Sequence, residues 1–366
     1  MPTLEKIVIQ DFRNIALQEL TFSPNINCIS GGNGEGKTNL LDAIWYLSMT
    51  KSAFSTSDRY NFRHGTSSFA IAGTYLMGGG TTRFSIQVTE GGEKRIRRDD
   101  KPYGRIAEHI GVLPIVMVSP SDISMVSESG EERRKFVNSV LAQMERPYLA
   151  DMQQYNRYLL QRNKLLKAGV SDEDLLSAFD ERLSALATPI FARRAAFCES
   201  LLPIVQQYYA EISGGREQVG IEYRSDLHKG DLRTQLRDLR ERDYIFKFTT
   251  AGIQRDDFLF TMDGHPIRRY GSQGQQKSFL VALKFAQYEV MKAACGCPPV
   301  MLLDDLFDKL DMTRVSNLLS MVSDKDFGQI FLSDSNKVRT KSIVDALTSD
   351  RSYFQAQGGV FTPVNE

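Results

Sequence analysis

A glycine-rich loop that ends in lysine and threonine constrains this chain more than any other feature. Residues 31–38 read GGNGEGKT and fit the pattern G-x-x-x-x-G-K-[ST]. Such a loop wraps phosphates with backbone N–H groups, so it needs residues that accept a positive φ. Its lysine reaches the β- and γ-phosphates, and its threonine hydroxyl binds Mg²⁺. The sequence therefore predicts a nucleoside triphosphate and Mg²⁺ at Gly31, Gly32, Asn33, Gly34, Glu35, Gly36, Lys37 and Thr38.

The residues on either side of the loop have the order that such a site requires. Residues 25–30 read NINCIS, which is a short strand candidate. After the loop, an apolar helical face is expected at Leu40, Leu41, Ile44 and Leu47. Strand, loop and helix in this order predict an α/β fold.

Two adjacent carboxylates follow a second apolar run. Residues 300–303 read VMLL, as a buried parallel strand should, and Asp304 and Asp305 come directly after them. Ligands of such sheets bind at the carboxyl ends of the strands. We expect Asp304 to bind Mg²⁺ with Thr38, and Asp305 to act with Lys37 in catalysis by orienting the attacking water.

Residues 271–278, GSQGQQKS, form a polar cap on a core helix, whose apolar face is expected at Phe279, Leu283, Ala286 and Val290. Helix N-termini attract anions. The order of these elements resembles that of ABC-type ATPase heads, whose signature loop contacts the nucleotide held by a second subunit. The resemblance implies an ATP-dependent homodimer in which Ser272, Gln273, Gly274, Gln275 and the D-loop Asp311 act in trans on ATP.

Within that superfamily the whole chain is similar to the RecF family. The shared elements are FRN (12–14), SPSD (119–122), RRKF (133–136), QRDDF (254–258) and SQGQQ (272–276). The resemblance implies a cytoplasmic protein of DNA repair, replication, recombination and the SOS response to DNA damage. It further implies ATP-driven closure on double-stranded and gapped DNA, a weak DNA-stimulated ATPase for release, and recombinase loading with RecR- and RecO-type mediators.

Two other functions fit part of the pattern. One is an ABC-type ATPase of phage defence or coupled to a nuclease, although no nuclease module is visible after residue 312. The other is a transporter head, which a long helical insert and the absence of a switch histidine disfavour. Ser119 stands where transporter heads have glutamine, and Asp305 replaces glutamate. Where the histidine is expected the chain has Ser333, Asp334 and Ser335. Gln254 stands where the RecF family commonly has histidine. These differences favour slow hydrolysis.

The periodicity predicts an ABC-type head of the α/β class with an antiparallel β subdomain and an inserted helical lobe. We expect residues 1–120 and 245–366 to form the ATPase lobe and residues 121–244 to form the insert, with its second long helix extending to Pro189.

Charge and cysteine content limit the remaining possibilities. The formal net charge is zero, so DNA must bind a local patch. Candidates are Arg157, Arg162 and Lys164 on one helix, with Lys167, or a hairpin that contains Lys94, Arg95, Arg97, Arg98, Lys101 and Arg105; each could equally be a solvated surface. The four cysteines, Cys28, Cys198, Cys295 and Cys297, favour inert thiols over a metal or redox site. We expect no membrane partner, because no apolar run approaches the length of a membrane span.

Overall fold

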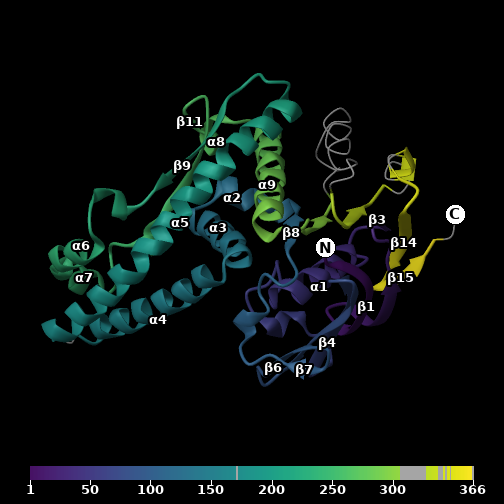
Figure 1. Cartoon of the computed structure of the whole chain (residues 1–366), viewed down its shortest axis with the longest axis horizontal. Helices are drawn as coiled ribbons and strands as arrows, with labels where there is room; N and C mark the ends of the chain where they lie inside the picture. The colour runs from purple at the N-terminus through teal and green to yellow at the C-terminus, as the bar shows by residue number, and fades with distance from the viewer. Residues whose placement is uncertain (170–171, 306–326, 337–340, 343, 347, 365–366) are drawn as a thin grey trace. The chain divides into compact units, whose positions relative to one another are not determined.

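The computed structural model describes residues 1–169, 172–305, 327–336, 341–342, 344–346 and 348–364. The chain divides into two compact units (Figure 1). The first contains residues 1–122, 211–214 and 277–366, and the second contains residues 123–210 and 215–276.

A six-stranded sheet with a parallel centre carries the phosphate loop in the first unit. Its order is β15-β14-β3-β13-β12-β8, and only β15 runs antiparallel to its neighbour. The strands are β3 (Ile26–Ser30), β8 (Ile115–Val118), β12 (Val300–Leu303), β13 (Ile330–Asp334), β14 (Arg351–Gln357) and β15 (Val360–Pro363). Every residue of β3, β12 and β13 is buried, and β12 reads as an uninterrupted apolar run as a buried parallel strand should.

A second, antiparallel sheet has the order β2-β1-β4-β5-β6-β7. Its strands are β1 (Thr3–Phe12), β2 (Ile15–Thr21), β4 (Ser68–Met77), β5 (Gly80–Thr89), β6 (Lys94–Arg98) and β7 (Lys101–Pro102). Helix α1 (Lys37–Met49) contacts strands of both sheets, and its Leu40, Leu41, Ile44 and Leu47 are buried in the shared core. Both the expected antiparallel subdomain and the expected apolar face of α1 are therefore confirmed.

The second unit combines helices with a small antiparallel sheet of order β11-β10-β9 (Figure 1). Its strands are β9 (Val219–Arg224), β10 (Asp257–Met262) and β11 (His265–Pro266). Its helices are α2 (Ser124–Ser127), α3 (Gly130–Met144), α4 (Arg146–Ala168), α5 (Glu173–Ser213), α6 (Leu232–Asp238), α7 (Arg240–Phe246) and α8 (Ile267–Tyr270). The last three residues of α5 belong to the first unit.

Two expected boundaries are wrong. Helix α5 continues through Pro189 and Pro203, although proline lacks the N–H of an interior helical hydrogen bond. Its buried positions, Leu183, Ala187, Ile190, Phe197, Leu201, Val205 and Tyr209, recur at helical spacing across both prolines, so burial outweighs the local cost. The chain returns to the first unit at residue 277 rather than 245, because β9 and β10 pair with each other inside the second unit.

Helix α9 (Gln273–Cys295) begins in the second unit and continues in the first from Lys277 onward. Phe279, Leu283 and Ala286 are fully buried and Val290 is nearly so, as its periodicity predicts. Among the helices of the described residues, none is long and apolar enough to cross a membrane.

Candidate nucleotide-binding site

The phosphate loop lies between β3 and α1, and close packing fixes its glycines. Gly36 has φ 104°, and a Cβ there would come within 2.8 Å of the Asn14 side chain. A Cβ on Gly31 would lie 2.6 Å from the carbonyl oxygen of Ala356 on β14. The turn after β14 also braces the loop, since the Gly359 N–H donates to the Glu35 carbonyl at 2.9 Å. Glycine is therefore required at both positions.

Lys37 is buried over this loop. Its ammonium donates to the carbonyl oxygens of Gly31 at 2.9 Å and Gly32 at 3.0 Å. These carbonyls hold the cation beside the loop into which phosphates are expected to bind. A lysine placed in this way supplies a compact positive charge to a polyphosphate.

Thr38 and Asp304 are far apart in the sequence but lie within hydrogen-bond distance of each other in the structure. The Thr38 hydroxyl lies 2.9 Å from Oδ2 and 3.1 Å from Oδ1 of Asp304. Ser333, on the strand between them, donates to Asp304 Oδ1 at 2.6 Å. Burial raises the pKa of Asp304 above its usual value, while these hydroxyls and the charge of Lys37 oppose that shift. Hydroxyl and carboxylate oxygens are the donors that Mg²⁺ prefers, so the pair fits this metal.

Asp305 has an uncommon backbone conformation. Its φ of 41° lies in the left-handed region, and its N–H donates to Ser333 Oγ at 3.0 Å. Strain of this kind is retained where the surrounding structure imposes it, often at functional sites. Ser333 therefore contacts both adjacent acids at once.

The FRN element contributes Arg13 and Asn14 to the site. The motif alone predicts no role for either residue. Arg13 forms an ion pair with the buried Asp42 of α1 at 2.7 Å and donates to Asn39 Oδ1 at 3.0 Å. The Asn39 amide donates in turn to Asn14 Oδ1 at 2.7 Å. Burial raises the pKa of Asp42, and the charge of Arg13 opposes that shift. This network fixes the helix turn that follows Lys37 and Thr38.

A cavity of about 510 Å³ adjoins Arg13 and is lined by Phe54, Ser55, Thr56 and Tyr60. It offers an aromatic and polar wall near the start of α1, which suits the base and ribose of a nucleotide. The signal in the sequence was only the FRN motif, because residues 54–60 have no distinctive pattern.

Ser119 follows β8, beside Asp304 at the carboxyl edge of the sheet. The Asp304 N–H donates to the Val118 carbonyl at 2.9 Å, and the Ser119 N–H donates to Asp122 Oδ2 at 2.7 Å. Lys284 forms an ion pair with Asp122 at 3.0 Å. The SPSD element thus forms a turn anchored to α9 rather than presenting a free side chain.

The signature residues form a capping box on α9. The Ser272 Oγ accepts from the Gln275 N–H at 3.3 Å, and Gln275 Oε1 accepts from the Ser272 N–H at 2.7 Å. Gln275 also donates to Glu217 at 2.8 Å. Ser272 and Gln273 remain exposed, and Gly274 is partly exposed. Asp311, the expected D-loop residue, lies outside the described residues.

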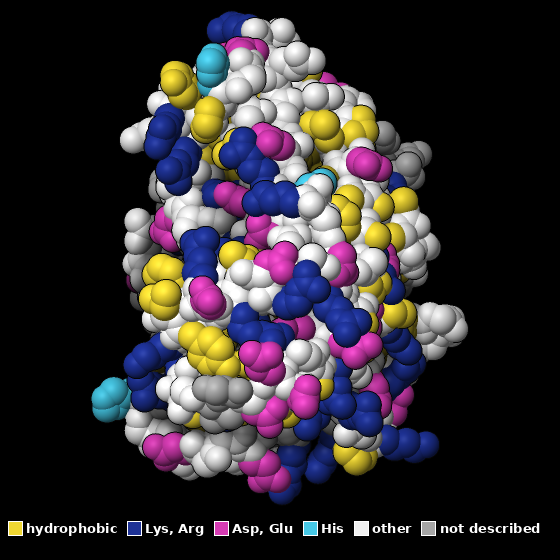
Figure 2. Space-filling view, turned by 90° about the vertical axis from the view of Figure 1, so that its left-hand side faces the viewer, with side chains coloured by type: hydrophobic (Ala, Val, Ile, Leu, Met, Phe, Trp, Pro, Cys, Tyr) yellow, Lys and Arg dark blue, Asp and Glu magenta, His cyan; other side chains and the backbone are white. Residues whose placement is uncertain are grey.

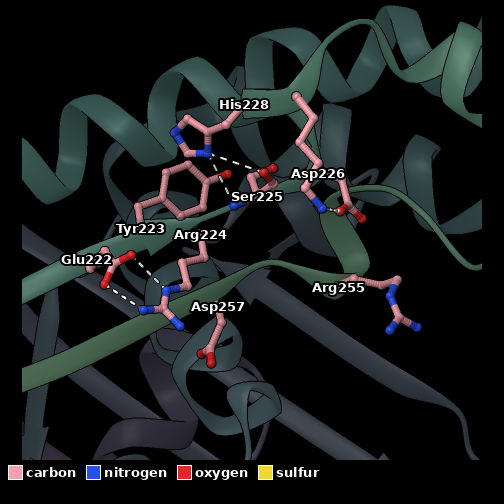
Figure 3. Close-up of a pocket in the computed structure, with 9 residues that line it drawn as sticks. Glu222, Tyr223, Arg224, Ser225, Asp226, His228, Arg255 and Asp257 are labelled. Atoms are coloured by element: carbon pink, nitrogen blue, oxygen red, sulfur yellow. Dashed lines mark hydrogen bonds and ion pairs between the residues drawn. The ribbon is translucent and has the colours of Figure 1, made fainter. Parts of the chain in front are cut away.

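The RRKF and QRDDF elements build the second unit. Arg133 binds Asp257 in a bidentate manner at 2.8 and 3.1 Å, and Arg194 pairs with Asp256. Burial opposes ionisation of Asp257, but Arg133 outweighs it and lowers the pKa of that carboxyl. Arg255 is exposed and is one of the residues that line a cavity of about 620 Å³, and its side chain points away from Asp257 (Figure 3). Gln254 accepts a hydrogen bond from Tyr155.

One expected DNA contact is wrong. Arg162 is fully buried and pairs with Asp180 at 2.7 Å and Asp243 at 2.6 Å, so it cannot reach a DNA phosphate in this structure. Arg157 and Lys164 are exposed on the same helix. In the hairpin cluster, Lys94 pairs with Asp58 at 2.8 Å, whereas the other five basic residues are exposed.

The fold and the loop together define an ABC-type ATPase head. The model of the AAA domain family matches residues 6–188. Solved Smc heads share the fold, as in that of Pyrococcus furiosus bound to the C-terminal domain of ScpA, with a TM-score of 0.59 at 15% identity over 100% of this chain and 96% of that one. The predicted fold class is thereby confirmed.

More specific matches identify the family. The chain is 39% identical over 363 residues to the DNA replication and repair protein RecF of Parabacteroides distasonis, covering 99% of this chain and 100% of that protein. It is 40% identical to RecF of Flavobacterium johnsoniae, covering 93% and 96%. A structure of the recombination mediator protein RecF-ATP in the RecFOR pathway matches with a TM-score of 0.90, 27% identity and coverage of 100% and 98%. The chain belongs to the RecF family of DNA replication and repair proteins.

Proposed function

We propose that this chain is an ATP-gated DNA-binding protein of recombinational repair. ATP binding closes two copies into a homodimer on DNA, and slow hydrolysis releases them. The contact of Thr38 with Asp304 beside the Lys37 loop carries the nucleotide part of this proposal. The similar protein described as RecF-ATP supports ATP as the nucleotide.

Each residue of the site has a distinct role in the proposal. Lys37 neutralises the β- and γ-phosphates, and the glycine loop donates its N–H groups to them. Thr38 and Asp304 hold Mg²⁺, which neutralises phosphate charge when bound. Asp305 orients the attacking water, and its N–H contact with Ser333 fixes its backbone.

The second copy completes the site in the proposal. The exposed capping box presents Ser272, Gln273, Gly274 and Gln275 at a helix N-terminus, which suits the γ-phosphate of ATP held by the partner. Asp311 has the corresponding D-loop role. Hydrolysis is slow and stimulated by DNA, since Asp305 is shorter than glutamate and Ser333 cannot act as an imidazole would.

The proposed DNA partners are duplex and gapped DNA, bound without sequence preference in the cytoplasm. Mediators of the RecR and RecO type join the complex and promote recombinase loading at gaps. The RecFOR pathway named for a similar solved protein supports this assignment.

The test is the affinity for a fluorescent duplex, measured by anisotropy with ATP and Mg²⁺, with ADP, and without nucleotide. The proposal expects tight binding only with ATP, weakening steeply as salt rises and changing little with sequence. Equal affinity under all three conditions would show that ATP does not gate DNA binding.

A further inference from the structure

A turn at the end of α7 exposes three large apolar side chains. Ile245 is 77% exposed, Phe246 is 53% exposed and Phe248 is 41% exposed. Single exposed apolar residues are ordinary on protein surfaces, but a group of them marks an interaction surface. We call residues 245–248 the aromatic turn.

Buried hydrogen bonds hold the aromatic turn in place. Arg162 donates to Asp243 at 2.6 Å and to the Thr249 hydroxyl at 2.9 Å, on either side of the turn. Asn163 Oδ1 accepts from the Thr249 N–H at 2.8 Å. Lys247 has φ 59°, so the backbone reverses between the two phenylalanines. The rings are therefore anchored to α4 while remaining exposed.

The neighbouring face of α4 is positively charged. Arg157, Leu160, Lys164 and Lys167 follow one another at helical spacing and are all exposed, and residues 152–168 contain no carboxylate. Leu160, Lys164 and Lys167 lie within one turn of Asn163, which contacts the aromatic turn. Figure 2 shows hydrophobic side chains beside Lys and Arg, with acidic side chains interspersed, on the side where α4 and α7 are labelled in Figure 1.

Charged groups on α7 complete the surface. The Arg242 guanidinium lies 5.6 Å from the centre of the Phe246 ring. Glu241, which precedes Arg242, is an exposed acid. Glu173 lies 3.9 Å from Arg240, and Arg240 also pairs with Asp180. Arg242 thus adds a cation against one of the exposed rings.

We propose that the aromatic turn and the basic face of α4 bind single-stranded DNA. Bases stack on exposed aromatic rings regardless of sequence, and lysine and arginine contact the phosphates. An apolar protein partner would not require a helix face that carries cations and no carboxylate. Since DNA is the ligand, the proposal rests on the proposed function, and it assigns this surface to the unpaired strand of a gap.

The experiment measures the affinity for a fluorescent oligothymidine strand. The variant is Phe246→Ala with Phe248→Ala, and the control is Leu17→Ala, which removes another apolar side chain that is 70% exposed but belongs to the first unit. We expect the double variant to bind oligothymidine roughly tenfold or more weakly, and the control to bind normally. Lys164→Gln with Lys167→Gln should reduce the slope of log affinity against log salt by about 0.7 for each cation.

Two comparisons separate this inference from the proposed function. The double variant should keep ATP-dependent binding to an intact duplex and lose the tighter binding expected for a duplex with a gap. An unmodified chain that fails to bind oligothymidine, or a double variant that binds it normally, overturns the inference; normal binding by the variant would leave the surface to a protein partner. ATP-independent duplex binding contradicts only the proposed function.

Discussion

Replacing Arg162 by methionine separates a structural arginine from a DNA-binding one. Arg162 is fully buried in the second unit, where its guanidinium contacts Asp180, Asp243 and the Thr249 hydroxyl. Methionine keeps the long apolar stem and removes the charge. We expect a large loss of stability, because two buried carboxylates lose their shared cation.

The structure limits the size of that loss. Removing one partner of a buried ion pair typically costs about 3–5 kcal/mol. Asp180 keeps Arg240 at 2.9 Å, and Asp243 keeps the Thr250 N–H at 2.8 Å, so both carboxylates retain a donor. We therefore expect the lower end, about 3 kcal/mol, which lowers the melting temperature of the second unit by about 6–12 °C.

Thermal unfolding followed by circular dichroism measures this change, and Arg157→Met is the control. Arg157 is exposed on the same helix, and residues 152–168 of that helix include no Asp or Glu with which it could pair. Its replacement should therefore change the stability by less than about 0.5 kcal/mol. An Arg162→Met protein that melts as the wild type does but binds DNA poorly would contradict a structural role, because Arg162 would then face DNA.

Three further predictions concern the nucleotide site and the thiols. Lys37→Ala should weaken ATP binding roughly 10- to 100-fold in calorimetry, and Lys37→Arg should bind ATP but hydrolyse it slowly; unchanged binding by Lys37→Ala would exclude the phosphate-loop assignment. Asp305→Asn should bind Mg²⁺-ATP and persist as a dimer, whereas Asp304→Asn should lose metal-dependent affinity; equal effects would contradict their separate roles. Burial raises the pKa of Cys28 and Cys198 to about 12, so in the native protein at pH 8 iodoacetamide should modify both far more slowly than after unfolding, and fast labelling would show that these thiols are accessible.

Local patterns predicted the phosphate loop and the strands at residues 25–30 and 300–303, because each of these features has its own period or spacing. The apolar run before Asp304 became a buried parallel strand, and the loop before Lys37 joined a strand to a helix. The contact between Asp304 and Thr38 followed from a general rule, since the carboxyl ends of parallel strands share one edge.

Other features depend on contacts that no local pattern contains. A proline usually ends a helix, but α5 passes through Pro189 because tertiary burial on both sides stabilises it. In the sequence nothing distinguishes Arg162 from an exposed arginine of the same helix. Its burial depends on ion pairs with Asp180 and Asp243, which are distant from it in the sequence. Ser333 likewise acquires a role from its position between two strands, where it contacts Asp304.

Light scattering with and without ATP and Mg²⁺ measures whether the nucleotide joins two copies of this chain. We predict the mass of one chain without nucleotide and of two chains with it. Ser272→Arg should keep ATP binding but remain a single chain. The long cation would occupy the closed dimer interface, where the N-terminus of α9 is already positive. A wild-type chain that stays monomeric with ATP would contradict ATP-driven dimerisation. A Ser272→Arg chain that loses ATP affinity as severely as Lys37→Ala does would contradict the action of Ser272 on the partner's nucleotide.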